Sequence, residues 1–136
     1  MYLYKRLIAL ALLLSLSFSI SAKGITEKEQ LICAISETAL CLENAGCTQG
    51  SVEIVDLPLL LKLDLAKKTI KSTRLSGEHR ASTITTTSTS KNNLILQGVQ
   101  DGSGWSMTVD KKNGQMSVSS SLDGQGYVAF GVCTRS

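Results

Sequence analysis

The chain has 136 residues, of which 43% are hydrophobic and 18% charged, with a formal net charge of +3. This length suits one ordinary domain and is too short for two. No long run of Lys and Arg follows residue 22, so the sequence lacks a stretch that would neutralise a series of phosphates. We therefore expect no nucleic-acid partner.

Residues 1–22 have the pattern of a secretory signal peptide. Lys5 and Arg6 precede an apolar run, which gives way to small residues that end at Ala22. The apolar run is shorter than the ~20 residues needed to cross a bilayer. We expect cleavage near Ala22, a periplasmic or secreted product with no membrane span, and a net charge of about +1 once both basic residues are lost. Residues 23–136 are expected to form a single mainly β domain.

Four cysteines follow this segment, an even number that predicts two disulfides in a small exported domain. Three pairings are open. We favour Cys41 with Cys47 as a local clip, and Cys33 with Cys133 as a tie between the two ends of the domain. The sequence has neither a CxxC pair nor a second histidine, so we expect no metal site, and no motif indicates a cofactor.

The segment before Gly46 is ambiguous between helix and strand. Thr26 and Glu29 have capping-box spacing, and Gly46 would end a helix well, which predicts a short N-terminal helix. Two cysteines instead suggest an extended arm, in which the Ser-Glu pair at 36–37 forms a hairpin turn. Residues 27–45 remain open, with strand and loop favoured.

The middle of the chain alternates in the manner of strands. Leucines at 59, 61, 63 and 65 share one face, and Pro58 suits only the start of such a strand, because proline cannot donate to a ladder. A turn leads to a second strand around Ile70. The Ser/Thr-rich stretch from Ser82 to Ser90 is β-branched and polar, which predicts a solvated edge strand.

The C-terminal part predicts a series of hairpins. Trp105, Met107 and Val109 share a face, and Asn113-Gly114 is a strong hairpin signal. Residues 126–133 form the last strand. The count is seven or eight short strands joined by tight turns, which predicts a disulfide-bonded antiparallel meander, either a flattened barrel or a sandwich.

Several segments resemble a family of small exported Gram-negative proteins that carries no assigned function. They are "CAISETALCLENAGC", "VDLPLLLKLDLAKKTI", "LILQG", "GWSMTVDKKNGQM" and "YVAFGVC", which together span most of residues 33–133. The shared positions are turn and core residues. The resemblance therefore implies a bacterial envelope protein and a fold, and it implies no catalytic residue.

No residue pattern stands out as catalytic. His79 is the only histidine and lies in a polar turn, where we expect a solvated loop residue. Five aspartates lie mostly beside glycines or at strand ends, where a carboxylate bonds turn backbone, and the Asp-Gly turns lack the further oxygen ligands of a calcium loop. These aspartates are Asp56, Asp64, Asp101, Asp110 and Asp123.

The sequence thus predicts a protein that binds and does not catalyse. Trp105 is expected in the core, or outward with Tyr127 as a contact patch. The leading hypothesis is a binding or inhibitor-like module for an envelope or host protein, with loops 101–105 and 122–127 at the contact. One alternative is a carrier of a small apolar ligand, although leucine, methionine and tryptophan would tend to fill its barrel. The other is a hydrolase that uses Asp101, Asp110 and Asp123. Oligomeric state stays open.

Overall fold

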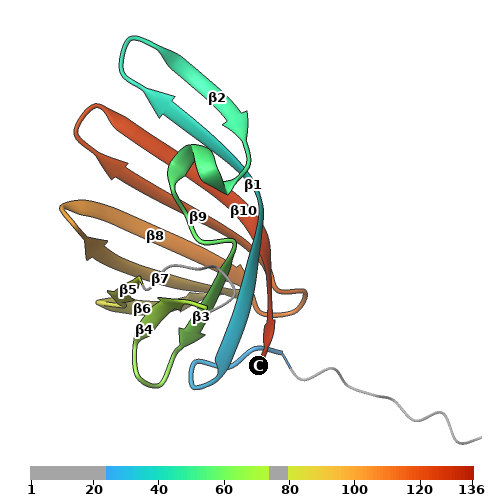
Figure 1. The fold of residues 1–136 in the computed structure, drawn as a ribbon. Coiled ribbons are helices and arrows are strands. Elements are labelled where there is room, and N and C mark those ends of the chain that lie inside the picture. The colour runs from blue at the N-terminus through green and yellow to red at the C-terminus, as the bar shows by residue number, and fades with distance from the viewer. Residues whose placement is uncertain (1–23, 74–79) are drawn as a thin grey trace, which may run out of the picture.

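A computed structural model describes residues 24–73 and 80–136 as one antiparallel sheet of ten strands with a single 3-10 helix, η1 (Figure 1). The signal-peptide prediction and His79 lie outside the described residues. The elements are β1 (Gln30–Leu42), β2 (Gly46–Gly50), η1 (Val52–Val55), β3 (Leu60–Asp64), β4 (Thr69–Ser72), β5 (Ala81–Thr83), β6 (Thr86–Ser90), β7 (Asn93–Gln100), β8 (Ser103–Asp110), β9 (Gln115–Leu122) and β10 (Gln125–Arg135).

The sheet is curled into a half-barrel, with strand order β5-β4-β3-β1-β10-β9-β8-β7-β6 and with β2 paired to the C-terminal part of β1 (Figure 1). The two strands at the ends of this order, β5 and β6, are consecutive in the chain. Between them, Ile84 N–H donates to the Lys68 carbonyl and Thr85 N–H to the Gln97 carbonyl, each at 2.8 Å. The link therefore draws the two ends of one sheet together, which excludes a sandwich of two packed sheets.

For the segment left open between helix and strand, the favoured strand is confirmed, and the alternative of a short N-terminal helix was wrong. Residues 30–42 form one long strand, and the predicted turn at 36–37 is instead an irregularity in its register with β10, between Ile35 and Glu37. Thr26 N–H does donate to the Glu29 carboxylate at 3.1 Å, but this contact closes a turn. Strand pairing on both edges of β1 outweighs the local helix propensity, because propensity differences are small beside tertiary packing.

Two disulfides join neighbouring strands in the pairing that the sequence favoured. Cys33–Cys133 connects β1 to β10, and Cys41–Cys47 connects β1 to β2. Such bonds are typical of an oxidising, extracellular-type environment. Among the described residues, no helix has the length and apolar character needed to cross a membrane.

The remaining strands follow the predicted alternation. Leu61, Leu63 and Leu65 are buried, whereas Leu59 precedes β3 and is 54% exposed. The Ser/Thr-rich stretch lies at the sheet ends as predicted, but it splits into β5 and β6. This split and the short β2 contribute to a strand count above the predicted seven or eight.

One end of the half-barrel is filled by large side chains, and we call it the filled end. Cross-strand register brings Leu63 beside Leu31, Leu94 beside Val109, and Cys33 beside Cys133, all buried. Moving along β8, β9 and β10 from these residues towards Ser103, Leu122 and Gln125 leads to the opposite end. We call that end the cavity end.

Candidate functional site

A cavity of about 460 Å³ lies at the cavity end of the half-barrel. Strands β8, β9 and β10 form one wall, and the segment 54–58 forms the facing wall with parts of β4 and β5. Its floor is apolar and is shared by four buried side chains, Leu61, Ile70, Met107 and Val118. This volume lies within the range of pockets that hold small molecules.

The sheet wall carries a row of three residues in register. Trp105 on β8 pairs with Ser120 on β9, and Ser120 pairs with Tyr127 on β10. All three line the cavity, with both rings partly buried. Because Ser120 is small, the space above it between the two aromatic residues is not filled by the middle strand.

The indole of Trp105 is held on the side away from Tyr127. Its Nε1–H donates to Ser82 Oγ at 3.0 Å. The ring lies over Gly98 on β7, where a Cβ atom would come within 2.4 Å of the ring and 2.5 Å of the Thr83 carbonyl oxygen. Glycine at position 98 therefore leaves room for the indole against β7 and for the Thr83 carbonyl of β5 to approach β7.

Three hydroxyl groups form a polar cluster on the same wall. Ser103 Oγ donates to the Ser121 main-chain carbonyl at 3.0 Å and also contacts Ser120 Oγ. Burial raises the pKa of Tyr127, and this rise is opposed by a hydrogen bond with Ser120 and by the positive charge of Arg80. The phenol therefore stays protonated throughout the neutral pH range.

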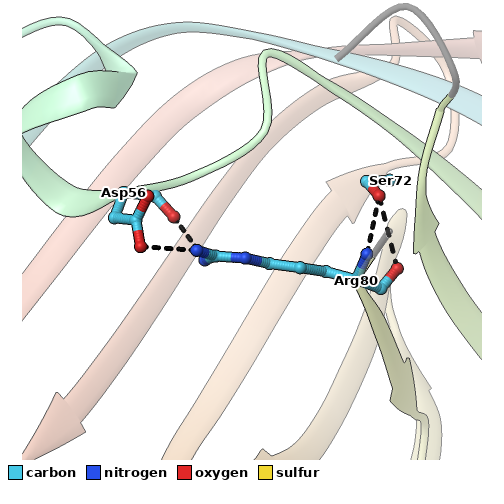
Figure 2. A network of polar contacts seen from close by, with 3 residues as sticks. All are labelled: Asp56, Ser72 and Arg80. Carbon is cyan, nitrogen blue, oxygen red and sulfur yellow. Dashed lines mark hydrogen bonds and ion pairs between the residues drawn. The ribbon is translucent and has the colours of Figure 1, made fainter. Parts of the chain in front are cut away.

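Arg80 holds the facing wall in place (Figure 2). Its guanidinium donates to the main-chain carbonyl of Asp56 and forms an ion pair with the carboxylate of the same residue. Its own N–H donates to Ser72 Oγ at 2.8 Å, and Ser72 N–H donates back to the Arg80 carbonyl at 2.9 Å. Arg80 thereby ties the start of β5 both to β4 and to the segment after η1.

Thr38 fixes the other end of this segment. It is completely buried, and its hydroxyl lies 3.1 Å from the Gly50 carbonyl and 2.8 Å from the Ser51 carbonyl. Val52 at the start of η1 is buried, and Asp56 ends η1 in the left-handed conformation at φ 52°. The wall formed by residues 54–58 is thus anchored at both ends.

The structure brings Trp105 and Tyr127 to one cavity wall, on the concave face. Of the aspartates considered from the sequence, Asp56 and Asp101 line the cavity, whereas Asp64, Asp110 and Asp123 do not. Sequence reasoning missed Arg80, Ser82, Ser103 and Ser120. The only signal of the three serines was a small polar residue at an inward position of an alternating strand, which the surrounding Ser/Thr-rich sequence concealed. Arg80 precedes β5 and gave no such signal.

The carboxylates with displaced pKa values lie outside the cavity lining. Hydrogen bonds from the N–H groups of Asn113 and Lys112 lower the pKa of Asp110. A hydrogen bond from the Thr26 N–H, together with the positive charge of Arg135, lowers the pKa of Glu29. A hydrogen bond from the Ser51 hydroxyl lowers the pKa of Glu53. All three are exposed turn or end contacts, and a lowered pKa is the opposite of what a general acid requires.

In the described part of the chain, no three His, Cys, Asp or Glu side chains cluster in a way that would hold a metal ion. The cavity instead has an apolar floor, and its lining also carries a few hydroxyl groups, the Asp56–Arg80 ion pair, and the charged residues Lys71 and Asp101. Comparison with known proteins finds no matching family model, no matching curated protein and no matching solved structure.

Proposed function

We propose that this protein is an exported, non-catalytic module that binds a small, largely apolar molecule in the cavity. The observation that carries the proposal is a volume of about 460 Å³ with an apolar floor and an aromatic residue on either side of Ser120. Small-molecule sites characteristically combine apolar and aromatic lining with a few polar groups that fix orientation.

The residues that make the space support a binding role. Larger side chains at Ser120 and Ser103 would reduce the cavity, and the alternation of the strands would accept valine or leucine at both positions. Small polar residues there leave the space beside the apolar and aromatic lining unfilled, which costs packing energy in the empty protein. A ligand that fills that space would recover this energy.

Export fits the same role. The two disulfides suit an oxidising compartment, and the N-terminal pattern is that of a secretory signal peptide. We therefore propose that the protein works in the periplasm or outside the cell.

Binding can be measured with N-phenyl-1-naphthylamine, an apolar dye that fluoresces more strongly in apolar surroundings. We expect the purified protein to enhance its emission with a saturable dependence on concentration. The variant Ser120→Phe would fill the space between Trp105 and Tyr127 and should abolish the signal.

The matched control is Ser119→Phe, which adds the same ring one residue away on the exposed outer face of the same strand. It should leave dye binding unchanged. Circular dichroism and thermal unfolding check that both variants fold. If the wild-type protein does not bind the dye, or if Ser120→Phe binds it as well as Ser119→Phe does, the proposal is wrong.

A second candidate is recognition of an envelope or host protein, as the sequence first suggested. On the outer face of β10, Val128, Phe130 and Val132 are 37%, 47% and 53% exposed and alternate along one strand. Exposed aromatic and aliphatic side chains in a row are common in protein interfaces. Loss of a partner's binding in Phe130→Ser, with dye binding intact, would favour this role.

A further inference from the structure

We propose that the filled end of the half-barrel is a docking surface for a bilayer that contains anionic phospholipids. The docked protein would stand with its cavity end pointing away from the bilayer. This inference goes beyond the proposed function, because it concerns the opposite end of the sheet and does not depend on whether the cavity holds a ligand.

The filled end is formed by three turns and by the segment that precedes β1 (Figure 1). The turns join β3 to β4, β6 to β7 and β8 to β9. Six lysines lie in these parts of the chain, all of them exposed except the partly buried Lys111. We call them the lysine cluster: Lys28, Lys67, Lys68, Lys91, Lys111 and Lys112.

Backbone hydrogen bonds hold these turns against one another. Lys111 N–H donates to the Asn92 carbonyl at 2.7 Å, and the Lys111 carbonyl accepts from Ile25 N–H at 2.8 Å. At the other end of the segment before β1, Leu65 N–H donates to the Glu29 carbonyl at 3.1 Å. This segment therefore spans the end of the half-barrel and gathers lysines from separate turns on one surface.

Carboxylates at the same end offset only part of this charge. They are Glu27, Glu29, Asp64 and Asp110. Within the described residues, Lys67 is the one member of the lysine cluster that forms an ion pair, with Asp64 at 3.9 Å. Arg135 pairs with Glu29 at 3.0 Å. Seven cations, Arg135 included, thus face four carboxylates, which leaves a net side-chain charge of +3 at the filled end.

The cavity end carries the opposite charge. Five carboxylates lie in its turns and in the segment from η1 to Asp56. They are Glu43, Glu53, Asp56, Asp101 and Asp123. The cations described there are Arg80, which pairs with Asp56, and Lys71, which contributes to the cavity lining. The net side-chain charge of this end is therefore −3 among the residues that the structure describes.

The two ends are far enough apart to act independently in salt. Strands β8 and β9 have eight residues each and are therefore about 25 Å long, at about 3.3 Å per residue. The screening length at physiological ionic strength is about 8 Å, so a surface that touches one end hardly senses the other. An anionic surface would therefore attract the filled end and leave the cavity end pointing away from it.

The side chains of the lysine cluster suit a lipid surface. Lysine carries a point charge on a flexible stem, whereas planar recognition of one carboxylate or phosphate favours arginine. No large exposed hydrophobic side chain is found in the described turns of this end, although protein interfaces usually centre on such residues. Charges of this kind are typical of proteins attracted to the headgroups of anionic phospholipids.

Cosedimentation with vesicles tests the proposal. The protein is used without residues 1–22, since their apolar run would itself enter lipid. Each net positive charge at an anionic surface contributes about fivefold in affinity. We therefore expect binding to vesicles of phosphatidylglycerol and phosphatidylcholine in equal parts to be about a hundredfold stronger than to phosphatidylcholine alone. About 0.5 M NaCl should remove this difference.

Charge reversals locate the surface. Lys91→Glu should lower the affinity for the anionic vesicles about thirtyfold, because it changes the charge of the lysine cluster by two. Lys112→Glu, in a different turn, should have the same effect. The matched control is Lys62→Glu, which changes the net charge equally on an exposed position in the middle of β3 and should alter the affinity about twofold or less. Circular dichroism checks that all three variants fold.

Trp105 reports the orientation, since it is the only tryptophan and lies at the cavity end. Phospholipids with brominated acyl chains quench a tryptophan only at short range, so we expect its emission to stay unchanged when the protein is bound. Quenching would overturn the proposed orientation.

Other results would overturn the docking surface itself. If anionic vesicles bind no better than neutral ones, the proposal is wrong. If Lys62→Glu loses as much affinity as Lys91→Glu and Lys112→Glu, the vesicles respond to net charge and the assignment to the filled end fails. If soluble polyphosphate binds as tightly as the vesicles at equal anionic charge, the assignment to lipid fails.

Discussion

The filled end and the cavity end of the half-barrel use the same strands and the same alternation, yet only one of them is packed. At the filled end, β8 and β9 face inward with Val109 and Met116, which pair directly. Four residues further along each strand, the inward positions are Trp105 and Ser120, and the space above the serine is open. The strands are continuous, so the difference comes from the side chains that face inward and not from the backbone of β8 and β9.

This contrast suggests a division of labour within one sheet. The filled end supplies stability through close packing and the Cys33–Cys133 bond. The cavity end is kept in shape by polar contacts instead, mainly those of Arg80 with Asp56 and of Thr38 with Ser51. Substitutions at the filled end would then mainly lower the free energy of unfolding, and substitutions at the cavity end would mainly change binding.

The largest expected effect concerns the disulfides. Replacing Cys33 and Cys133 by alanine opens a link between residues 100 apart and should lower the free energy of unfolding by about 4.7 kcal/mol in the chain-entropy model. Replacing Cys41 and Cys47, which are 6 apart, should cost about 2 kcal/mol. Urea denaturation measures both. Equal losses would contradict the view that the long-range bond stabilises the filled end.

An intermediate effect is expected from shortening leucines at the two ends. Leu63→Ala leaves a hole at the filled end, where the side chain is completely buried, and should cost about 3 kcal/mol. Leu122→Ala removes a side chain that is 40% exposed at the cavity end and should cost less than about 1 kcal/mol. Thermal unfolding of both variants gives the comparison. A larger loss for Leu122→Ala would reverse the assignment of the two ends.

The smallest effect appears only in alkali and concerns Tyr127. Burial raises its pKa above the ordinary tyrosine value near 10, so the unfolded chain loses this proton at lower pH than the folded protein. Its contribution to stability is therefore fully present below pH 10 and lost as the pH rises through the raised value. Urea denaturation at pH 9 and pH 11 should show a steeper loss for the wild type than for Tyr127→Phe.

A direct titration sharpens this test. In a chain that starts at Lys23, Tyr127 is the only tyrosine, since the other two are Tyr2 and Tyr4. The ultraviolet absorbance of phenolate then reports Tyr127 alone, and its midpoint should lie above that of the same chain in urea. Coinciding midpoints would mean that the phenol is not buried against the cavity wall.

Much of the fold follows from alternation in the sequence. The inward set of Trp105, Met107 and Val109 and the hairpins were predicted, because period-two patterns and turn residues act locally. The two disulfides were predicted from an even number of cysteines in a small exported domain. The conformation of residues 30–42 was not settled in this way. Whether this segment forms a helix or a strand depends on partners far away in the chain. One of them is β10, with which β1 pairs along nearly its whole length.

The candidate site could be predicted only in part. Trp105 and Tyr127 were singled out as unusual residues, but no local pattern indicated that a serine stands between them or that Arg80 faces them. Ser120 lies on a different strand from either aromatic residue. Arg80 precedes β5, and its ion-pair partner Asp56 is 24 residues earlier in the chain. Register sets such proximity, and register is a property of the assembled sheet.

The sequence by itself therefore determined the class of the protein: a short chain with an export pattern, paired cysteines and alternating strands. Each of these depends on covalent chemistry or on the spacing of neighbouring residues. Only the tertiary structure decided that the sheet curls, that β1 is a strand and that small inward residues on adjacent strands coincide to leave a cavity. The physical reason is that a cavity is a missing volume, which exists only once the surrounding side chains have been brought together.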